Sequence, residues 1–142
     1  MRFSRRSPGS THISRSVARV FDHLDFRVGD VPHAKPFYDA MLRLFGMRGK
    51  VQEDGSVIYL RIKGGRVEEA FALLEDRAHR PNGTRVAFGA AAPQDVDRIA
   101  ERLREAGAQR AEGPEFCPEI GPNYYAFFFE DAEGNKFEVV CR

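Results

Sequence analysis

The feature that most constrains the fold is a repeated order of predicted elements. The first half of the 142-residue chain predicts a strand, a helix and three further strands, and the second half predicts the same order. With an offset of 62 residues, His23 aligns with Arg85 and Phe26 aligns with Phe88. Matched positions in a matched order of elements indicate an internal duplication of a β-α-β-β-β unit.

The first unit starts with residues 21–28, where polar and apolar side chains alternate as in a half-buried strand. Asp30 stands where the N-cap of a helix belongs, and Gly46 is placed to end that helix. Pro36 lacks a backbone donor and restricts the residue before it, so we expect the regular helix to begin late. The remaining strands of the unit are predicted over residues 47–53, 56–62 and 68–74.

The second unit begins after a polar loop over residues 75–83. Pro93 suits the first turn of its helix, and Gly107 is placed to end it. The strands are predicted over residues 84–90, 109–112, 124–129 and 136–141, with a loop over 113–122. The two modules therefore span about residues 21–78 and 84–142.

Charge and composition exclude several classes of protein. The net charge is +1, which gives no support to nucleic-acid or anionic-membrane binding, and no apolar run is long enough to cross a membrane. Two cysteines without a CxxC pair favour a reduced, cytoplasmic setting. Residues 1–20 form a basic, Ser/Arg-rich arm with five arginines and no acid. This arm is interpreted as a loose extension, a phosphate-contacting segment or a transit peptide.

Three sequence stretches then resemble one known family. They are FDHLDFRVGDVPHAKPFYDAMLRLFGM from Phe21, RVAF from Arg85 and GPNYYAFFFEDAEGNKFEVVC from Gly121. Together they resemble the vicinal oxygen chelate superfamily of glyoxalase I, bleomycin-resistance proteins and extradiol dioxygenases. The resemblance implies an α+β fold in which two tandem β-α-β-β-β modules form an open, cup-shaped mixed sheet of about eight strands. It also implies a homodimer and a small-molecule ligand in the cup.

The resemblance implies metal ligands on the first strand of each module and on the last strand of the second. In this chain those positions carry His23, Arg85 and Glu138, and the end of the first module places Ala72 where glyoxalase I has a glutamate. A guanidinium stays protonated and has no lone pair, so Arg85 cannot be a ligand. His23 and Glu138 alone fall short of the three protein ligands that a catalytic site needs.

Two hypotheses for the cup remain open. In the first the metal is lost, and Arg85 either anchors an anionic ligand or pairs with Glu138. In the second a divalent zinc, iron, nickel or manganese ion is held by His23, Glu138 and a third group such as Glu75 or His79. Without the resemblance, His23 would be an ordinary hydrogen-bonded strand residue and Glu138 a surface acid.

Further candidate residues lie on neighbouring strands. Tyr124 and Tyr125 face opposite ways on a strand, so one of them should enter the cup and donate a hydrogen bond to a ligand. Glu138 is a candidate ligand or general base. Tyr59 and Arg61 share a strand face and are candidate ligand-binding residues lining the cup, or else solvated side chains.

These observations predict a protein that binds a small organic molecule in a cup with an incomplete metal site. The molecule is anionic if Arg85 anchors it. The alternative is a metal-dependent lyase, isomerase or dioxygenase that uses His23, Glu138 and an unidentified third ligand. The residues do not name the substrate, because one fold of this kind supports several chemistries.

Overall fold

The two predicted modules are present in the computed structural model, which describes residues 13–142. The first module contains β1 (His23–Val28), α1 (Val31–Arg43), β2 (Arg48–Val51), β3 (Val57–Lys63) and β4 (Arg66–Glu75). The second contains β5 (Arg85–Gly89), α2 (Pro93–Ala106), β6 (Gln109–Phe116), β7 (Tyr125–Glu130) and β8 (Lys136–Cys141). A short 3-10 helix, η1 (Ile13–Ser16), precedes the first module.

The two modules have the same sheet topology, as the duplicated sequence pattern predicts. The strand orders are β1-β4-β3-β2 and β5-β8-β7-β6, and the first strand of each module is parallel to the last. The other neighbours are antiparallel, so both sheets are mixed. The α+β class and the tandem β-α-β-β-β modules are therefore confirmed. The eight strands remain two open sheets with no hydrogen-bonded pairing between them in the described chain.

Helix α1 begins earlier than the sequence predicts and contains Pro36 in its interior. Its first turn is capped by side chains outside the helix, because the Asp30 side chain accepts a hydrogen bond from the His33 amide and the Glu75 side chain accepts one from the Val31 amide. Pro36 removes one intrahelical hydrogen bond, and this cost does not outweigh the capped start and the buried face of the helix. The expectation of a late start was therefore wrong.

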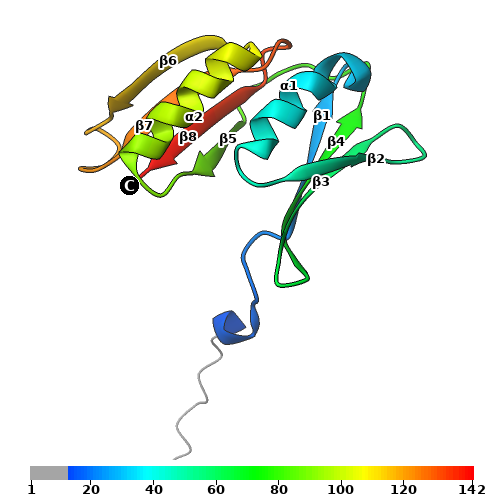
Figure 1. Cartoon of the computed structure of the whole chain (residues 1–142), viewed down its shortest axis with the longest axis horizontal. Coiled ribbons are helices and arrows are strands. Elements are labelled where there is room, and N and C mark those ends of the chain that lie inside the picture. Colours follow the sequence, from blue (N-terminus) through cyan, green and yellow to red (C-terminus); the bar gives the residue numbers. More distant parts are fainter. Residues whose placement is uncertain (1–12) are drawn as a thin grey trace, which may run out of the picture.

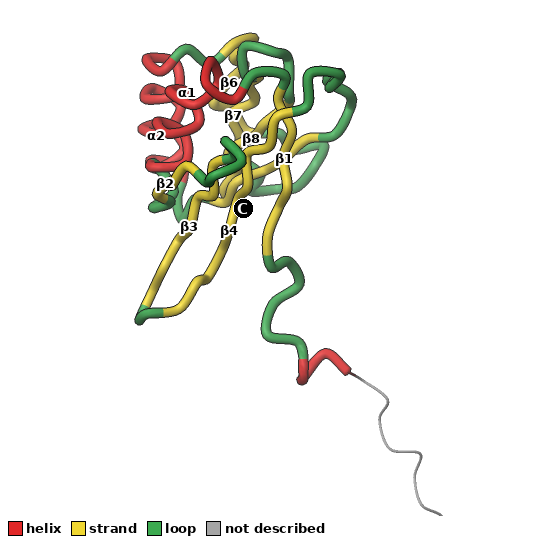
Figure 2. Tube along the Cα trace, turned by 90° about the vertical axis from the view of Figure 1, so that its right-hand side faces the viewer, coloured by secondary structure: helices red, strands yellow, loops and turns green. Residues whose placement is uncertain are grey.

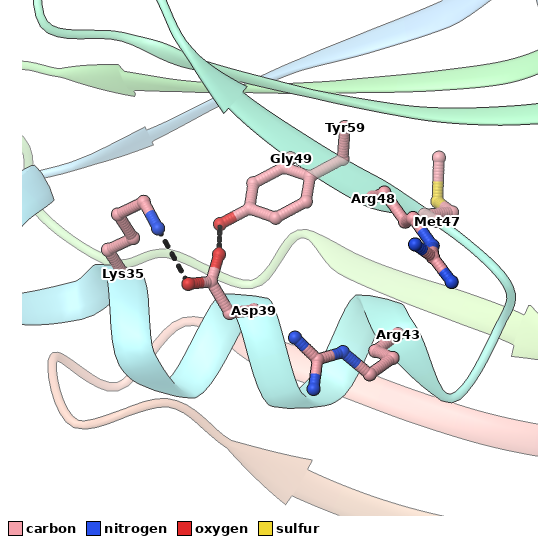
Figure 3. A pocket seen from close by; sticks show the side chains of 7 residues that line it. All are labelled: Lys35, Asp39, Arg43, Met47, Arg48, Gly49 and Tyr59. Atoms are coloured by element: carbon pink, nitrogen blue, oxygen red, sulfur yellow. Dashed lines mark hydrogen bonds and ion pairs between the residues drawn. The ribbon is translucent and has the colours of Figure 1, made fainter.

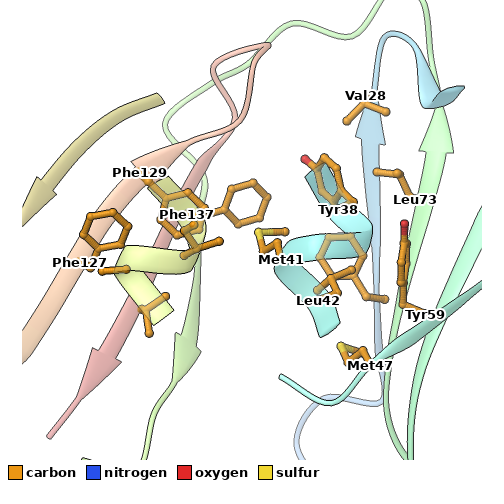
Figure 4. Close-up of a cluster of buried hydrophobic side chains, with 14 of the residues drawn as sticks. Val28, Tyr38, Met41, Leu42, Met47, Tyr59, Leu73, Phe127, Phe129 and Phe137 are labelled. Carbon is orange, nitrogen blue, oxygen red and sulfur yellow. The ribbon is translucent and has the colours of Figure 1, made fainter. Parts of the chain in front are cut away.

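Each helix lies over one face of its own module's sheet, and the two helices pack against each other, so the modules share one core (Figure 1). The ring of Phe26 on β1 lies 5.2 Å from that of Phe137 on β8, and Phe45 after α1 stacks on Phe88 of β5 at 4.5 Å. Figure 4 shows the buried side chains of α1 placed between the strands of both modules. Figure 2 shows that the β3–β4 hairpin extends away from this core.

Each sheet therefore has two different faces. The helix face of each sheet packs into the shared core, and the opposite face, called here the open face, carries no helix. On β8, for example, Phe137 and Val139 belong to the shared core, whereas Val140 belongs to a separate small cluster with Tyr124.

The basic arm falls mostly on residues 1–12, which lie outside the described residues. Its last part contacts the first sheet, because Arg19 donates to the Val67 carbonyl at 3.1 Å and pairs with Asp22 at 2.5 Å. Within residues 13–142, neither helix is long and apolar enough to cross a membrane.

Candidate functional site

The candidate site is centred on Glu138, a buried carboxylate on the open face of the second sheet. Its side chain is on β8, where alternation turns Phe137 and Val139 to the core and Glu138 to the other face. Only 6% of Glu138 is exposed. The Tyr124 hydroxyl donates a short hydrogen bond to the Glu138 Oε1 atom. A carboxylate buried in this way needs such a donor, because burial without one is costly.

Tyr124 is the tyrosine that faces this site. Burial and the hydrogen bond to Glu138 raise the pKa of the Tyr124 phenol to about 12. The phenol therefore remains protonated at neutral pH and acts as a donor. Tyr125 faces the other side of β7, as strand alternation predicts, and its hydroxyl donates to Asp97 of α2 at 2.5 Å.

Two arginines flank the Glu138–Tyr124 pair without forming an ion pair with the carboxylate. The guanidinium of Arg85 lies over the Phe128 ring, 5.0 Å from its centre, and that of Arg142 lies over the Tyr124 ring at 4.9 Å. The hypothesis that Arg85 pairs with Glu138 is therefore wrong for this chain. The register explains the difference, because Glu138 stands beside Ala87 and Arg85 lies two residues earlier on β5.

Arg142 also belongs to this site and was not among the residues predicted from the sequence. Strand alternation could have identified this residue, because Glu138, Val140 and Arg142 are spaced two residues apart and therefore point to the same face. Apolar side chains complete the surroundings of the site. They are Cys117, Ala126, Phe128 and Val140. Burial raises the pKa of the Cys117 thiol, so this cysteine contributes packing and is not an activated nucleophile.

His23 lies at the start of β1, on the other sheet. Its ring is exposed, and its Nδ1 atom lies 2.8 Å from the Asp22 carboxylate. The hydrogen bond with Asp22 and the nearby Asp25 raise the pKa of His23 above its ordinary value. Within residues 13–142, no hydrogen bond or ion pair joins His23 to Glu138.

The donor groups present within one chain do not make a metal site. The two candidate third ligands already have structural partners, since Glu75 accepts from the Val31 amide and His79 contacts the Asn135 side chain at 2.8 Å. In the described part of the chain, no three His, Cys, Asp or Glu side chains gather as a metal site requires. Arg85 adds a positive charge near Glu138 and offers no lone pair that could coordinate a metal ion.

The remaining predicted ligand-binding residues lie away from the Glu138 site. Tyr59 is 1% exposed and faces α1, where its hydroxyl donates to Asp39 at 2.7 Å. Arg61 lies in the β3–β4 hairpin and contacts Glu68 at 3.4 Å and Glu69 at 3.9 Å. Neither residue lines the open face around Glu138, because Tyr59 faces the core and Arg61 is exposed to solvent, as the alternative interpretation of a solvated side chain describes.

The fold and this site together define a protein built from paired β-α-β-β-β modules, with its candidate site on an open sheet face. A family model described as the Glyoxalase/Bleomycin resistance protein/Dioxygenase superfamily matches residues 20–139. The chain belongs to this superfamily. A comparison with curated proteins gave no match.

Solved structures with the same fold are numerous. A glyoxalase/bleomycin resistance protein from Albidiferax ferrireducens is 24% identical with a TM-score of 0.66, covering 87% of this chain and 99% of that one. The fosfomycin resistance protein FosX from Mesorhizobium loti is 22% identical with a TM-score of 0.58, covering 86% and 91%. FosX from Listeria monocytogenes, complexed with Mn(II) and sulfate, is 17% identical with a TM-score of 0.60, covering 84% and 86%. At these identities the likeness shows the fold.

Proposed function

We propose that this protein binds a small organic anion over the open face of the second sheet. The observation that carries the proposal is the pair of guanidinium groups, Arg85 and Arg142, beside a carboxylate that Tyr124 already engages. Within residues 13–142 neither arginine has a carboxylate partner. Guanidinium groups that no carboxylate engages can attract an anion.

The chemistry of the surroundings narrows the class of ligand. An arginine binds a carboxylate or phosphonate through two parallel hydrogen bonds, while the half-buried Phe128 ring offers apolar contact. We therefore expect an anion with an apolar or aromatic body. In this proposal Glu138 fixes the Tyr124 hydroxyl, and Arg85 and Arg142 hold the anionic group. No bond is made or broken, so the protein acts as a binding module.

Benzoate and phenylphosphonate are suitable probes, with benzamide as a neutral control of the same shape. We expect calorimetry to detect both anions and not benzamide. Arg85→Gln should weaken benzoate binding at least about tenfold, since a charge-assisted bidentate contact is lost. Arg102→Gln, which removes an exposed arginine of α2, should leave the affinity unchanged. Equal binding of benzamide, or unchanged binding by Arg85→Gln, would contradict the proposal.

The second candidate function is a metal-dependent lyase, isomerase or dioxygenase. It is favoured by the Mn(II) complex of the Listeria monocytogenes FosX and by the position of Glu138 on the last strand. Elemental analysis of the untagged protein, followed by titration with Mn(II), Zn(II), Ni(II) and Fe(II), tests it. Binding at micromolar levels that is lost in both His23→Gln and Glu138→Gln would establish this alternative.

We also propose a homodimer, as the resemblance implies. Exposed apolar side chains near the start of β1 and along the β3–β4 hairpin support this proposal, because they can form a contact between two subunits. They are Val20, Phe21, Ile62 and Val67. Light scattering coupled to size-exclusion chromatography should give twice the chain mass, and Phe21→Ser should shift the distribution toward monomer. A wild-type protein that elutes as a monomer at all concentrations would contradict the proposal.

A further inference from the structure

A second pocket lies on the helix face of the first sheet, between α1 and strands β2 and β3 (Figure 3). Its volume is about 550 Å³, and it is separate from the open face that carries Glu138. Three of its lining residues are cations, namely Lys35, Arg43 and Arg48, and one is an acid, Asp39. The pocket therefore carries a positive charge in excess.

The single acid in the pocket is already occupied. Both oxygens of Asp39 are used, because Lys35 binds one at 2.7 Å and the buried hydroxyl of Tyr59 donates to the other at 2.7 Å. Burial and this hydrogen bond raise the pKa of Tyr59, so the hydroxyl remains a donor. Asp39 thus neutralises Lys35 and does not neutralise the two arginines.

Arg43 and Arg48 have no carboxylate partner within residues 13–142. Arg43 stands in the last turn of α1, where a cation interacts favourably with the helix dipole. Arg48 begins β2 and has no such role in the helix. Both side chains border the same space from opposite sides, as Figure 3 shows. Both side chains are exposed, so their guanidinium groups are accessible to an anion from solution.

The wall of the pocket between these side chains is formed by Gly49 and the Tyr59 ring. Gly49 lies directly over the Tyr59 ring, and a Cβ atom at this position would come within 2.5 Å of Tyr59 Cε1. Glycine allows this close approach and leaves the backbone of β2 accessible beside Arg48. The wall is formed by contacts that fix its position, since Tyr59 is itself held by Asp39.

We propose that this pocket binds a phosphate group, free or carried by a small polar molecule. A dianionic oxyanion matches the two uncompensated charges, and the planar guanidinium of arginine binds phosphate oxygens in pairs. Arg43 and Arg48 hold the anion from two sides, and Lys35 stands at the edge with its charge shared with Asp39. The site is independent of the proposed function, because it lies on the other face of a different sheet.

The probe is inorganic phosphate. Chloride is lowered as phosphate is added, so that the ionic strength stays constant during the titration. Amide chemical shifts in ¹H–¹⁵N spectra should move at Arg48 and Gly49, and not at Glu138 or Val140. The Arg43→Gln/Arg48→Gln double variant should weaken phosphate binding at least about tenfold. Arg102→Gln removes one exposed arginine charge elsewhere and should leave the affinity unchanged.

Three outcomes would overturn the proposal. The first is an unchanged phosphate affinity in the double variant, with its spectrum showing the native fold. The second is an equal loss in Arg102→Gln, which would mean that net charge alone governs binding. The third is a set of shifts confined to residues around Glu138, which would assign phosphate to the open face and count against the pocket only.

Discussion

The hydroxyl of Tyr38 on α1 donates a 2.6 Å hydrogen bond to the carboxylate of Asp131, which lies 93 residues away in the turn between β7 and β8. Tyr38 is fully buried, so this bond joins the two modules inside the shared core. Asp131 also accepts from the amides of Glu133 and Asn135 within its own turn. One carboxylate therefore fixes the closing turn of the second module and attaches it to the helix of the first.

Tyr38→Phe removes this connection while keeping the ring. We expect a loss of about 1.5–3 kcal/mol in the free energy of unfolding, because a buried hydrogen bond to a carboxylate is lost. Urea denaturation measures the loss, and a single transition is expected since both modules share one core. Tyr125→Phe is the matched control, because its bond to Asp97 is exposed and should contribute less than about 1 kcal/mol. Equal losses in the two variants would contradict the importance of the inter-module bond.

Gly49→Ala tests the close contact between β2 and the Tyr59 ring. The added methyl group would overlap the ring, which cannot move without breaking its bond to Asp39, so we expect a loss of about 1–3 kcal/mol. Gly89→Ala is the control, since a Cβ atom on that strand residue meets no atom within 4 Å. Its effect should stay within about 0.5 kcal/mol. Thermal or urea unfolding of both variants makes the comparison, and a neutral Gly49→Ala would show that the ring is free to shift.

How far the sequence predicts this molecule depends on the range of the interactions involved. The duplicated order of elements and the alternation along each strand are local patterns, and they predict the modules and the opposite faces of Tyr124 and Tyr125. Alternation also places Tyr59 on one definite face of β3. It does not say which face the helix covers, because that depends on how the chain crosses the sheet.

The partners of the polar groups could not be predicted for the same reason. The Tyr59 hydroxyl donates to Asp39 on α1, and the Arg85 guanidinium lies over the ring of Phe128. Both contacts join elements that are distant in the sequence. The pocket cations were a partial exception. Lys35, Asp39 and Arg43 recur at every fourth residue, which places them along one side of a helix. The contribution of Arg48 required the position of β2.

His23 should titrate above its ordinary pKa of about 6.5, because Asp22 and Asp25 favour the protonated ring. Since the folded-state pKa is raised, the stabilisation is present below about pH 6.5 and is lost as the pH rises through the folded-state value. NMR titration of the imidazole should show a lower midpoint in Asp22→Asn. Asp95→Asn, a charge removal on α2, should leave the midpoint unchanged. A midpoint that does not move in Asp22→Asn would show that Asp22 does not govern the titration.

Arg85→His distinguishes a cup adapted to anions from one that has lost a metal ligand. The substitution removes a cation near Glu138 and supplies a ring nitrogen, which is a ligand for zinc, nickel and manganese. Arg85 and Glu138 share the open face of neighbouring strands, with Ala87 directly beside Glu138. We therefore expect the affinity for a divalent metal to rise at least about tenfold, and the affinity for benzoate to fall. Calorimetry on Arg85→His and on Arg85→His/Glu138→Gln measures both effects, and the gain in metal affinity should vanish in the double variant. A gain that persists without Glu138 would place the new metal site elsewhere, and no gain at all would mean that position 85 does not correspond to the ligand position of the metal-binding relatives.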